Sequence, residues 1–314
     1  MSAPGGLRGV LEAAQARRAS GTAFALALVT DTEGSTYRKA GALALVAADG
    51  TRTGTMSGGC LEPALEALCR EAIATGRPGV AVFDTRDDDD LLFGSGSGCR
   101  GRMRVLAWPL PGAGDALLDA LLAAHATGSA LDLSVGMDES NLGALAFDGS
   151  APAGLLLVRI APVPRLLLLG AGPEAPPLLR LAHTLGWETT VADHREGLLR
   201  PVRLSEANAL LALKPAAALA ATARQPDAVL VMTHLASADL EALRALSTAE
   251  VPYVGLLGPP GRRDELLAEL EPAQRAALLP RLHAPAGLFL GGEGPEAIAL
   301  AIAADLQRCF HAPR

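Results

Sequence analysis

The pattern of apolar and polar positions changes character near the middle of the chain. In the first half, strand-like apolar runs at residues 22–30 and 42–47 are separated by polar loops, and the turn at 48–50 is typical of a hairpin. From residue 165 onward, short apolar strands alternate with helical stretches, which is the pattern of a doubly wound parallel sheet. We therefore predict an α/β protein with an N-terminal α/β domain, a strand-rich extension and a C-terminal Rossmann-like domain.

A stiff linker marks the predicted boundary. Residues 161–164 read Ala-Pro-Val-Pro, and two consecutive X-Pro steps disfavour helix. The chain has 314 residues, which suits two domains of about 150 residues each. We predict an N-terminal domain over 1–110, the strand-rich extension and linker over 111–164, and the Rossmann-like domain over 165–314.

The composition excludes several classes of function. A net charge of −7 and an aromatic content of 3% disfavour binding to nucleic acid, which needs basic patches and stacking platforms. Apolar runs fall short of the ~18 residues of a membrane helix, and the polar start has no apolar signal core. We expect a cytoplasmic protein without a membrane partner. Its four cysteines do not have the short paired spacing of a zinc knuckle or a redox motif.

The sequence Ser57-Gly58-Gly59-Cys60, with Glu62 two positions after the cysteine, is the main candidate site. Glycines admit a bulky ligand to the backbone because they lack a Cβ. The thiol precedes a helical segment, and amide N–H groups at a helix start favour anions and lower a thiol's pKa. Cys60 is thus a candidate contact to a soft metal, with Glu62 orienting the site. The competing interpretation is a small buried apolar residue.

A second glycine-rich turn ends in cysteine downstream. It makes Gly96, Gly98 and Cys99 the second candidate group, with Cys99 as another candidate metal contact. The acidic run at residues 87–90 precedes it, and a solvated loop is favoured there over a hard-cation site because the spaced pattern of a calcium loop is missing.

The C-terminal half carries a dinucleotide fingerprint. Gly170-x-Gly172-x-x-Ala175 lies between a predicted strand and a predicted helix, and Asp193 follows 23 positions after the first glycine. In such a site the first glycine makes the tight turn, the second admits a pyrophosphate and the acid binds a ribose hydroxyl. The motif predicts a Rossmann fold more strongly than it predicts NAD(P), since the fold also serves other ligands.

Other polar residues could face the same crevice. His234 follows a predicted strand, where open α/β sheets bind ligands. Arg262 and Arg263 could bind a phosphate or simply begin a charged helix. His283, which precedes another glycine-rich turn, could line the crevice too.

Several stretches together resemble the XdhC/CoxI accessory proteins, and they cover nearly the whole chain in order. The paired SGGC and GSGC turns make the resemblance specific. The segments that carry it are residues 33–41, 54–62, 83–106, 166–195, 231–243 and 282–306.

The resemblance implies an accessory protein without catalytic residues of its own. Such a protein would bind molybdenum cofactor, as molybdopterin or its nucleotide form, and protect it while a sulfurase exchanges an oxo ligand for sulfur. It would then deliver the cofactor to a xanthine dehydrogenase-type molybdenum hydroxylase apoenzyme. A glycine cradle suits the phosphate of this cofactor, and a thiolate suits its metal.

Two other functions stay open at this stage. The fingerprint residues Gly170, Gly172 and Asp193 could serve an NAD(P)-dependent oxidoreductase, for which His234 is the one nearby acid–base candidate. The chain could also be a scaffold between a sulfurase and its target. The sequence leaves the oligomeric state open, a homodimer included, as well as the identity of the molybdoenzyme.

Overall fold

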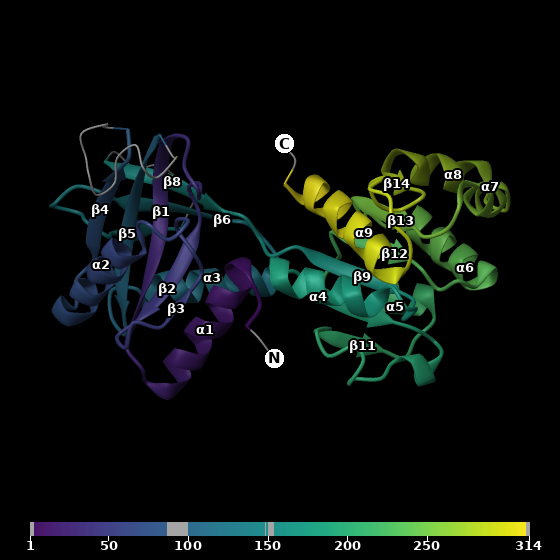
Figure 1. The fold of residues 1–314 in the computed structure, drawn as a ribbon, viewed down its shortest axis with the longest axis horizontal. Helices are drawn as coiled ribbons and strands as arrows, with labels where there is room; N and C mark the ends of the chain where they lie inside the picture. The colour runs from purple at the N-terminus through teal and green to yellow at the C-terminus, as the bar shows by residue number, and fades with distance from the viewer. Residues whose placement is uncertain (1–2, 87–99, 148, 150–153, 312–314) are drawn as a thin grey trace. The chain divides into compact units, whose positions relative to one another are not determined.

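The computed structural model describes residues 3–86, 100–147, 149 and 154–311. It divides into two compact units, Met1–Val163 and Pro164–Arg314, so the division falls at the predicted linker (Figure 1). The segment predicted as a separate extension belongs to the N-terminal unit, where its residues share one core with earlier strands and helices.

Within its described residues, the N-terminal unit contains two antiparallel sheets, and the predicted hairpin is formed by β2 and β3. The larger sheet has the order β3-β2-β1-β5-β4, and the smaller has the order β7-β6-β8. The elements are α1 (Gly6–Ser20), β1 (Phe24–Gly34), β2 (Leu43–Ala47), β3 (Arg52–Thr53), α2 (Glu62–Thr75), β4 (Gly79–Asp84), β5 (Gly101–Leu110), α3 (Asp115–Thr127), β6 (Leu131–Gly136), β7 (Leu145–Ala146) and β8 (Leu155–Ile160).

Strand β1 separates two cores, because successive side chains point to opposite faces. Ala25, Ala27 and Val29 pack in a core with α2. Phe24 and Leu26 pack on the other face with α1, α3 and the smaller sheet. The strand is therefore buried on both sides, which explains why its sequence is a continuous apolar run and does not alternate.

The C-terminal unit has one six-stranded parallel sheet with the order β11-β10-β9-β12-β13-β14. The chain winds from β9 to β11 in one direction and from β12 to β14 in the other, which confirms the predicted Rossmann-like fold. Its elements are β9 (Arg165–Leu169), α4 (Ala175–Leu185), β10 (Glu188–Ala192), η2 (Glu196–Leu198), β11 (Ala209–Leu211), α5 (Pro215–Ala221), β12 (Ala228–Val231), α6 (Ala236–Ser247), β13 (Tyr253–Leu256), α7 (Pro260–Ala268), α8 (Pro272–Leu278), η3 (Leu279–Arg281), β14 (Leu282–His283) and α9 (Pro295–Phe310).

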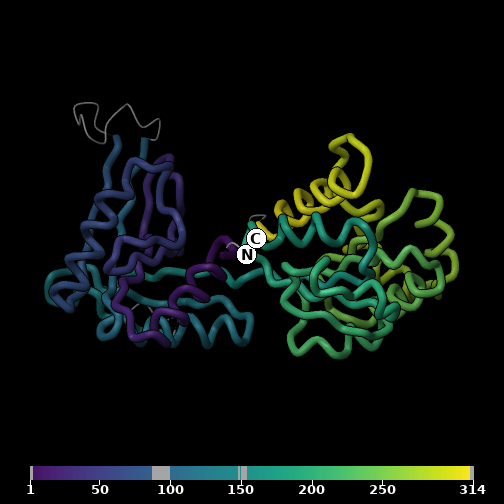
Figure 2. Tube along the Cα trace, turned by 60° about the horizontal axis from the view of Figure 1, so that its bottom comes forward, coloured from purple at the N-terminus to yellow at the C-terminus, as the bar shows by residue number. Residues whose placement is uncertain are grey.

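Helices cover both faces of this sheet. Helices α4 and α9 lie side by side on one face (Figure 2) and share a core with Leu166 and Leu168 of β9. Helices α6, α7 and α8 contribute to a core on the other face, with Leu167 and Leu169. Among the helices of the described residues, none is both long and apolar enough to cross a membrane.

Candidate functional site

The first candidate site is the loop between β3 and α2. The Ser57 hydroxyl accepts hydrogen bonds from the N–H groups of Gly59 (3.1 Å) and Leu61 (3.0 Å). The same hydroxyl donates to the Glu62 carboxylate, whose other oxygen accepts the Ser57 N–H at 3.0 Å. Ser57 and Glu62 are both buried. A closed network therefore holds the loop in one shape before Cys60 meets any ligand.

The charge on Glu62 stabilises this network. Burial raises the pKa of Glu62, but the hydrogen bonds from the Ser57 hydroxyl and N–H outweigh it, so the pKa lies below the ordinary glutamate value. Glu62 is also the first residue of α2, where a negative charge meets the positive end of the helix dipole.

Cys60 and Cys69 have opposite environments although they are close in sequence. Cys69 is fully buried among the α2 core residues, and burial raises the pKa of its thiol to about 12. The Cys60 thiol is exposed. Gly58 and Gly59 beside it are open, since a Cβ on either would meet nothing within 4 Å, and Gly59 has a φ of 119°. The buried-residue interpretation therefore fits Cys69, and Cys60 is free to contact a ligand.

Register places this loop at one end of the larger sheet. Strands β1, β3 and β4 end there, and β2 and β5 begin there. The polar loop at 34–42 thus leaves the sheet at the same end as the Cys60 loop. Gly96, Gly98 and Cys99, together with the acidic run at 87–90, lie outside the described residues.

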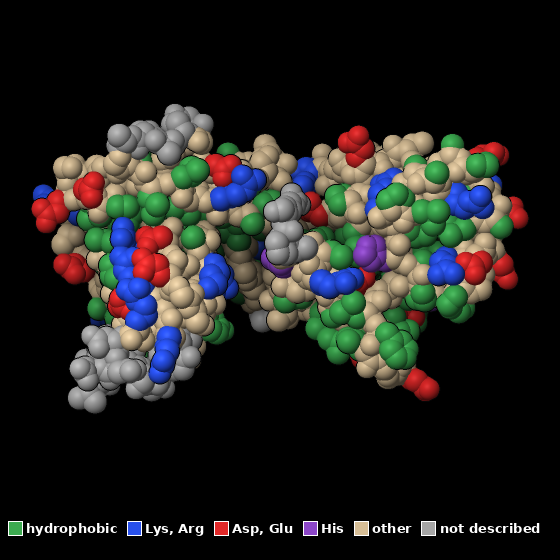
Figure 3. Space-filling view, turned by 90° about the horizontal axis from the view of Figure 1, so that it is seen from above, with side chains coloured by type: hydrophobic (Ala, Val, Ile, Leu, Met, Phe, Trp, Pro, Cys, Tyr) green, Lys and Arg blue, Asp and Glu red, His purple; other side chains and the backbone are tan. Residues whose placement is uncertain are grey.

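Charged side chains line β1, β4 and β5 towards this end, and Figure 3 shows acidic and basic side chains in neighbouring rows on this unit. Glu33 contacts Arg86 at 2.6 Å and Arg102 at 3.2 Å, and Asp31 contacts Arg102 at 3.3 Å and Arg104 at 3.4 Å. Because these cations are paired with acids, the row is not an open anion-binding patch.

Replacing Glu62 by glutamine should destabilise the N-terminal unit by about 1–3 kcal/mol at pH 7. The Ser57 oxygen already accepts two N–H groups, so it can only donate to residue 62, and one side of a glutamine amide cannot accept. The lowered pKa of Glu62 means that its contribution is present above the ordinary glutamate value and is lost as the pH falls through the lowered one. Urea unfolding at pH 7 and about pH 3 measures both effects.

Glu66→Gln on the same helix is the matched control, because Glu66 forms surface ion pairs with Arg52 and Arg70 that are worth about 0–1 kcal/mol. Equal effects of the two substitutions at pH 7 would contradict the role given to Glu62.

The second candidate site lies where the order of the parallel sheet reverses, between the ends of β9 and β12. Gly170 follows β9 with a φ of 124°, and a Cβ there would lie 2.5 Å from the Met232 carbonyl carbon and 2.8 Å from the Thr233 nitrogen. Glycine is therefore required by close contact with the neighbouring strand.

Asp193, predicted to bind a ribose hydroxyl, is fully engaged within the protein. Its carboxylate accepts the Ala171 N–H at 2.9 Å, the Arg195 N–H and Nε at 2.9 Å, and the Arg195 Nη2 at 2.7 Å. Burial raises the pKa of Asp193, but the hydrogen bonds from Arg195 and the Ala171 N–H outweigh this effect, so the pKa lies below the ordinary aspartate value. Through its hydrogen bond with the Ala171 N–H, the Asp193 side chain connects the glycine turn to the end of β10.

Two side chains cover Gly172, the residue expected to admit a pyrophosphate. A Cβ on Gly172 would lie 3.0 Å from both Glu174 Oε2 and His234 Nε2. These two side chains contact each other at 3.1 Å, and Glu174 is buried. On the other side, Arg203 donates to the carbonyls of Ala171 (3.0 Å) and Gly172 (2.9 Å). A carboxylate therefore lies beside the glycine that would admit the negatively charged pyrophosphate of a Rossmann ligand.

His234 has a φ of 62°, the left-handed conformation that non-glycine residues rarely adopt. The preceding residue is tightly held: the Thr233 hydroxyl donates to Asp239 at 2.6 Å, and Arg262 donates to the same carboxylate at 2.7 Å. Such strain persists only where surrounding contacts fix it, and it concentrates at functional sites.

The remaining predicted residues have structural partners. Arg262 is paired with Asp239, while Arg263 contacts Asp264 and the Ala284 carbonyl. His283 stacks on Tyr253 and contacts Asp305. Around this second site, sequence reasoning did not single out Glu174, Arg195, Arg203 and Asp239. Glu174 lies two positions after Gly172 and Arg195 two positions after Asp193, so their place in the sequence could have indicated a role. Arg203 and Asp239 have no predicted residue that close in sequence, and only the fold brings them to this site.

Two family models match the chain. The XdhC Rossmann domain matches residues 166–306, and the XdhC and CoxI family matches residues 17–84. These two matches fall in the C-terminal and N-terminal units respectively, and each includes one of the two candidate sites described above.

Relatives match over most of the chain. A Bacillus subtilis (strain 168) protein named as a probable xanthine dehydrogenase subunit is 30% identical over 90% of this chain and 91% of its own length. An Escherichia coli (strain K12) protein named as uncharacterised is 27% identical over 90% of this chain, which spans only 43% of that protein. A crystal structure described as a xanthine dehydrogenase from Bacillus halodurans has a TM-score of 0.83 and 29% identity, covering 97% of this chain and 96% of its own.

Proposed function

Because this chain belongs to the XdhC and CoxI family, we propose that it acts in the maturation of a xanthine dehydrogenase-type molybdenum hydroxylase. It binds molybdenum cofactor, protects it during sulfuration by a sulfurase, and delivers it to the apoenzyme. The names of its relatives support the link to xanthine dehydrogenase, and the exposed thiol and open glycines of the Cys60 loop support cofactor binding there.

One observation carries the proposal: an exposed thiol in a loop that the protein holds in place. Cys60 is exposed, Gly58 and Gly59 leave open space beside it, and the buried pair Ser57 and Glu62 fixes the loop. These residues fit a large ligand that carries a soft metal, since thiolate suits such a metal and glycines let the ligand approach the backbone. When bound, the cofactor supplies the molybdenum centre that the target enzyme uses.

The crevice of the C-terminal unit gives little support to an NAD(P)-dependent oxidoreductase. The Glu174 carboxylate lies over Gly172, and Asp193 is saturated by Arg195 and the Ala171 N–H. A pyrophosphate in the usual Rossmann position would meet the first carboxylate, and a ribose hydroxyl would find the second one occupied. The structure thus favours the accessory function over hydride transfer.

Protein purified from a molybdate-fed host tests the proposal. We expect mass spectrometry of the released ligand to find molybdopterin or its nucleotide form, and we expect the loaded protein to activate a molybdenum hydroxylase apoenzyme. Bound nicotinamide in place of pterin would favour the oxidoreductase. Binding to the apoenzyme and sulfurase without any pterin would favour a scaffold.

A further inference from the structure

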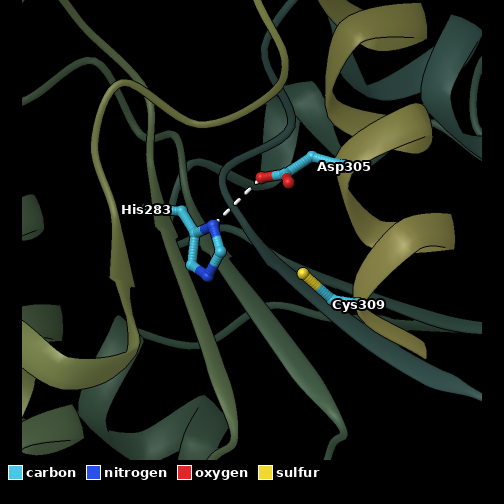
Figure 4. Close-up of side chains that lie close together, drawn as sticks. All are labelled: His283, Asp305 and Cys309. Atoms are coloured by element: carbon cyan, nitrogen blue, oxygen red, sulfur yellow. Dashed lines mark hydrogen bonds and ion pairs between the residues drawn. The ribbon is translucent and has the colours of Figure 1, made fainter. Parts of the chain in front are cut away.

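Three side chains of metal-binding type converge in the C-terminal unit. His283 comes from β14, and Asp305 and Cys309 come from α9. One donor atom of each lies within 4.8 Å of the other two (Figure 4). Asp305 and Cys309 are four residues apart, a spacing that puts both on one face of a helix. The function proposed above uses none of the three.

Neighbouring residues hold two of the three in position. The His283 ring stacks on Tyr253 with centroids 4.0 Å apart, and its Nδ1 lies 3.0 Å from Asp305 Oδ2. The Tyr253 hydroxyl donates to the same oxygen at 2.9 Å, and Arg308 donates to the other at 2.6 Å. Hydrogen-bond donors of this kind orient the ligating groups of metal sites.

The carboxylate is held ionised, as a ligand must be. Burial raises the pKa of Asp305, but the hydrogen bonds from Arg308 and Tyr253 outweigh it, so the pKa lies below the ordinary aspartate value. Arg308 is mostly exposed, so its guanidinium can turn towards solvent when a cation enters.

We propose that His283, Asp305 and Cys309 bind a divalent transition-metal ion of the Zn²⁺ type. Imidazole, carboxylate and thiolate all ligate this ion, and bond lengths of 2.0–2.3 Å imply donor atoms about 3.3–3.8 Å apart in a tetrahedral site. The His283–Asp305 pair, at 3.0 Å, already lies close to this spacing, and the longest separation, up to 4.8 Å, has to shorten by only about 1 Å. Rotation of the Cys309 side chain, which is not fully buried, supplies that movement.

Binding is accompanied by release of one proton. The metal takes the lone pair of His283 Nδ1, so the ring carries its proton on Nε2, and the Cys309 thiol proton leaves to solvent. Burial and the Asp305 charge raise the pKa of Cys309, and a coordinated cation overcomes both by deprotonating the thiol. Three protein ligands leave the fourth tetrahedral position to water, and the ion links the last helix to the last strand of the sheet.

Cobalt(II) is the probe, because thiolate ligation gives it a near-ultraviolet charge-transfer band and tetrahedral geometry gives strong visible bands. The reference protein is Cys60→Ser/Cys99→Ser, which removes the proposed cofactor contact and the second cysteine predicted from the sequence as a metal contact, and keeps Cys69 and Cys309. We expect about one equivalent of Co²⁺ to bind with both sets of bands, and Zn²⁺ to displace it. Excess Zn²⁺ should also raise the melting temperature.

Adding Cys309→Ser to the reference should abolish the charge-transfer band and weaken binding at least about tenfold. Adding His283→Gln should weaken binding similarly while keeping part of the band. Metal-free unfolding of each variant shows whether it folds as the reference does. Two results would overturn the proposal and leave a hydrogen-bonded cluster only. The first is a reference protein that lacks the charge-transfer band. The second is a band, together with a Zn²⁺-induced rise in melting temperature, that persists in the Cys309→Ser variant.

Discussion

Replacing Cys60 by serine should remove most of the molybdenum cofactor that we propose the protein binds, while leaving the fold intact. The thiol is exposed and the Ser57–Glu62 network does not use its sulfur, so the substitution costs little stability. A hydroxyl is a far poorer ligand for a soft metal than a thiolate. Mutating a residue that only hydrogen-bonds a metal ligand typically lowers metal affinity by about 10–100-fold. Loss of the ligand itself should cost at least as much, so we expect the cofactor content to fall at least about tenfold.

The measurement is the amount of pterin and molybdenum per folded protein in wild type and variant expressed in parallel. Glu66→Gln is the control, since it changes a surface ion pair on α2 of the same unit and should leave loading unchanged. Equal loading of Cys60→Ser and wild type would rule out the assigned role of Cys60.

Replacing Gly170 by alanine should destabilise the C-terminal unit by about 3 kcal/mol or more. A positive φ at a non-glycine residue costs about 1–3 kcal/mol. Here the added Cβ would also press on the Met232 carbonyl and the Thr233 nitrogen, which are backbone atoms that cannot turn aside. The midpoint of denaturant unfolding, followed by a probe in this unit such as Trp187 fluorescence, measures the effect.

Gly261→Ala provides the comparison. This glycine lies in α7, where an added methyl group would meet nothing within 4 Å, and alanine is the better helix former by about 1 kcal/mol. Its stability should therefore match or exceed that of wild type. A midpoint for Gly170→Ala equal to that of Gly261→Ala would show that the turn can relax, and that the glycine is not needed for the contact with β12.

The parts of the fold that sequence predicts best are those set by local signals. The apolar run before Gly170, the glycine turn and the helix after it lie within about twenty residues, and together they predict the Rossmann unit that the structure has. The β2–β3 hairpin was predictable for the same reason, because Asp49 and Gly50 make the turn.

The crevice was less predictable because its chemistry depends on distant residues. The fingerprint predicts an opening at Gly172, yet Glu174 closes it together with His234, which is 60 positions away. Asp193 stands at the expected position, but its partner Arg195 takes up the oxygens that a ribose would need. A sequence pattern places a residue on a strand, turn or helix, but it does not show which neighbour will form a hydrogen bond or ion pair with its side chain.

The two cysteines of the first site illustrate what periodicity alone can decide. Cys69 lies four residues after Leu65, so it shares the buried face of α2. Cys60 precedes the helix, and its exposure depends on how the loop closes through Ser57 and Glu62. That closure joins residues five apart in sequence, but glycine-rich sequence gives no indication of its shape.

The buried Ser57–Glu62 network has a consequence for how quickly a ligand proposed to bind at Cys60 would be exchanged. A loop that orders only around its ligand loses conformational entropy on loading and must disorder again on release. The hydrogen bonds of this loop are already formed in the structure, and none of them uses the Cys60 sulfur. Binding and release of a ligand at this loop would then require no folding step. The residence time of the ligand would depend only on its contacts with the exposed residues of the loop.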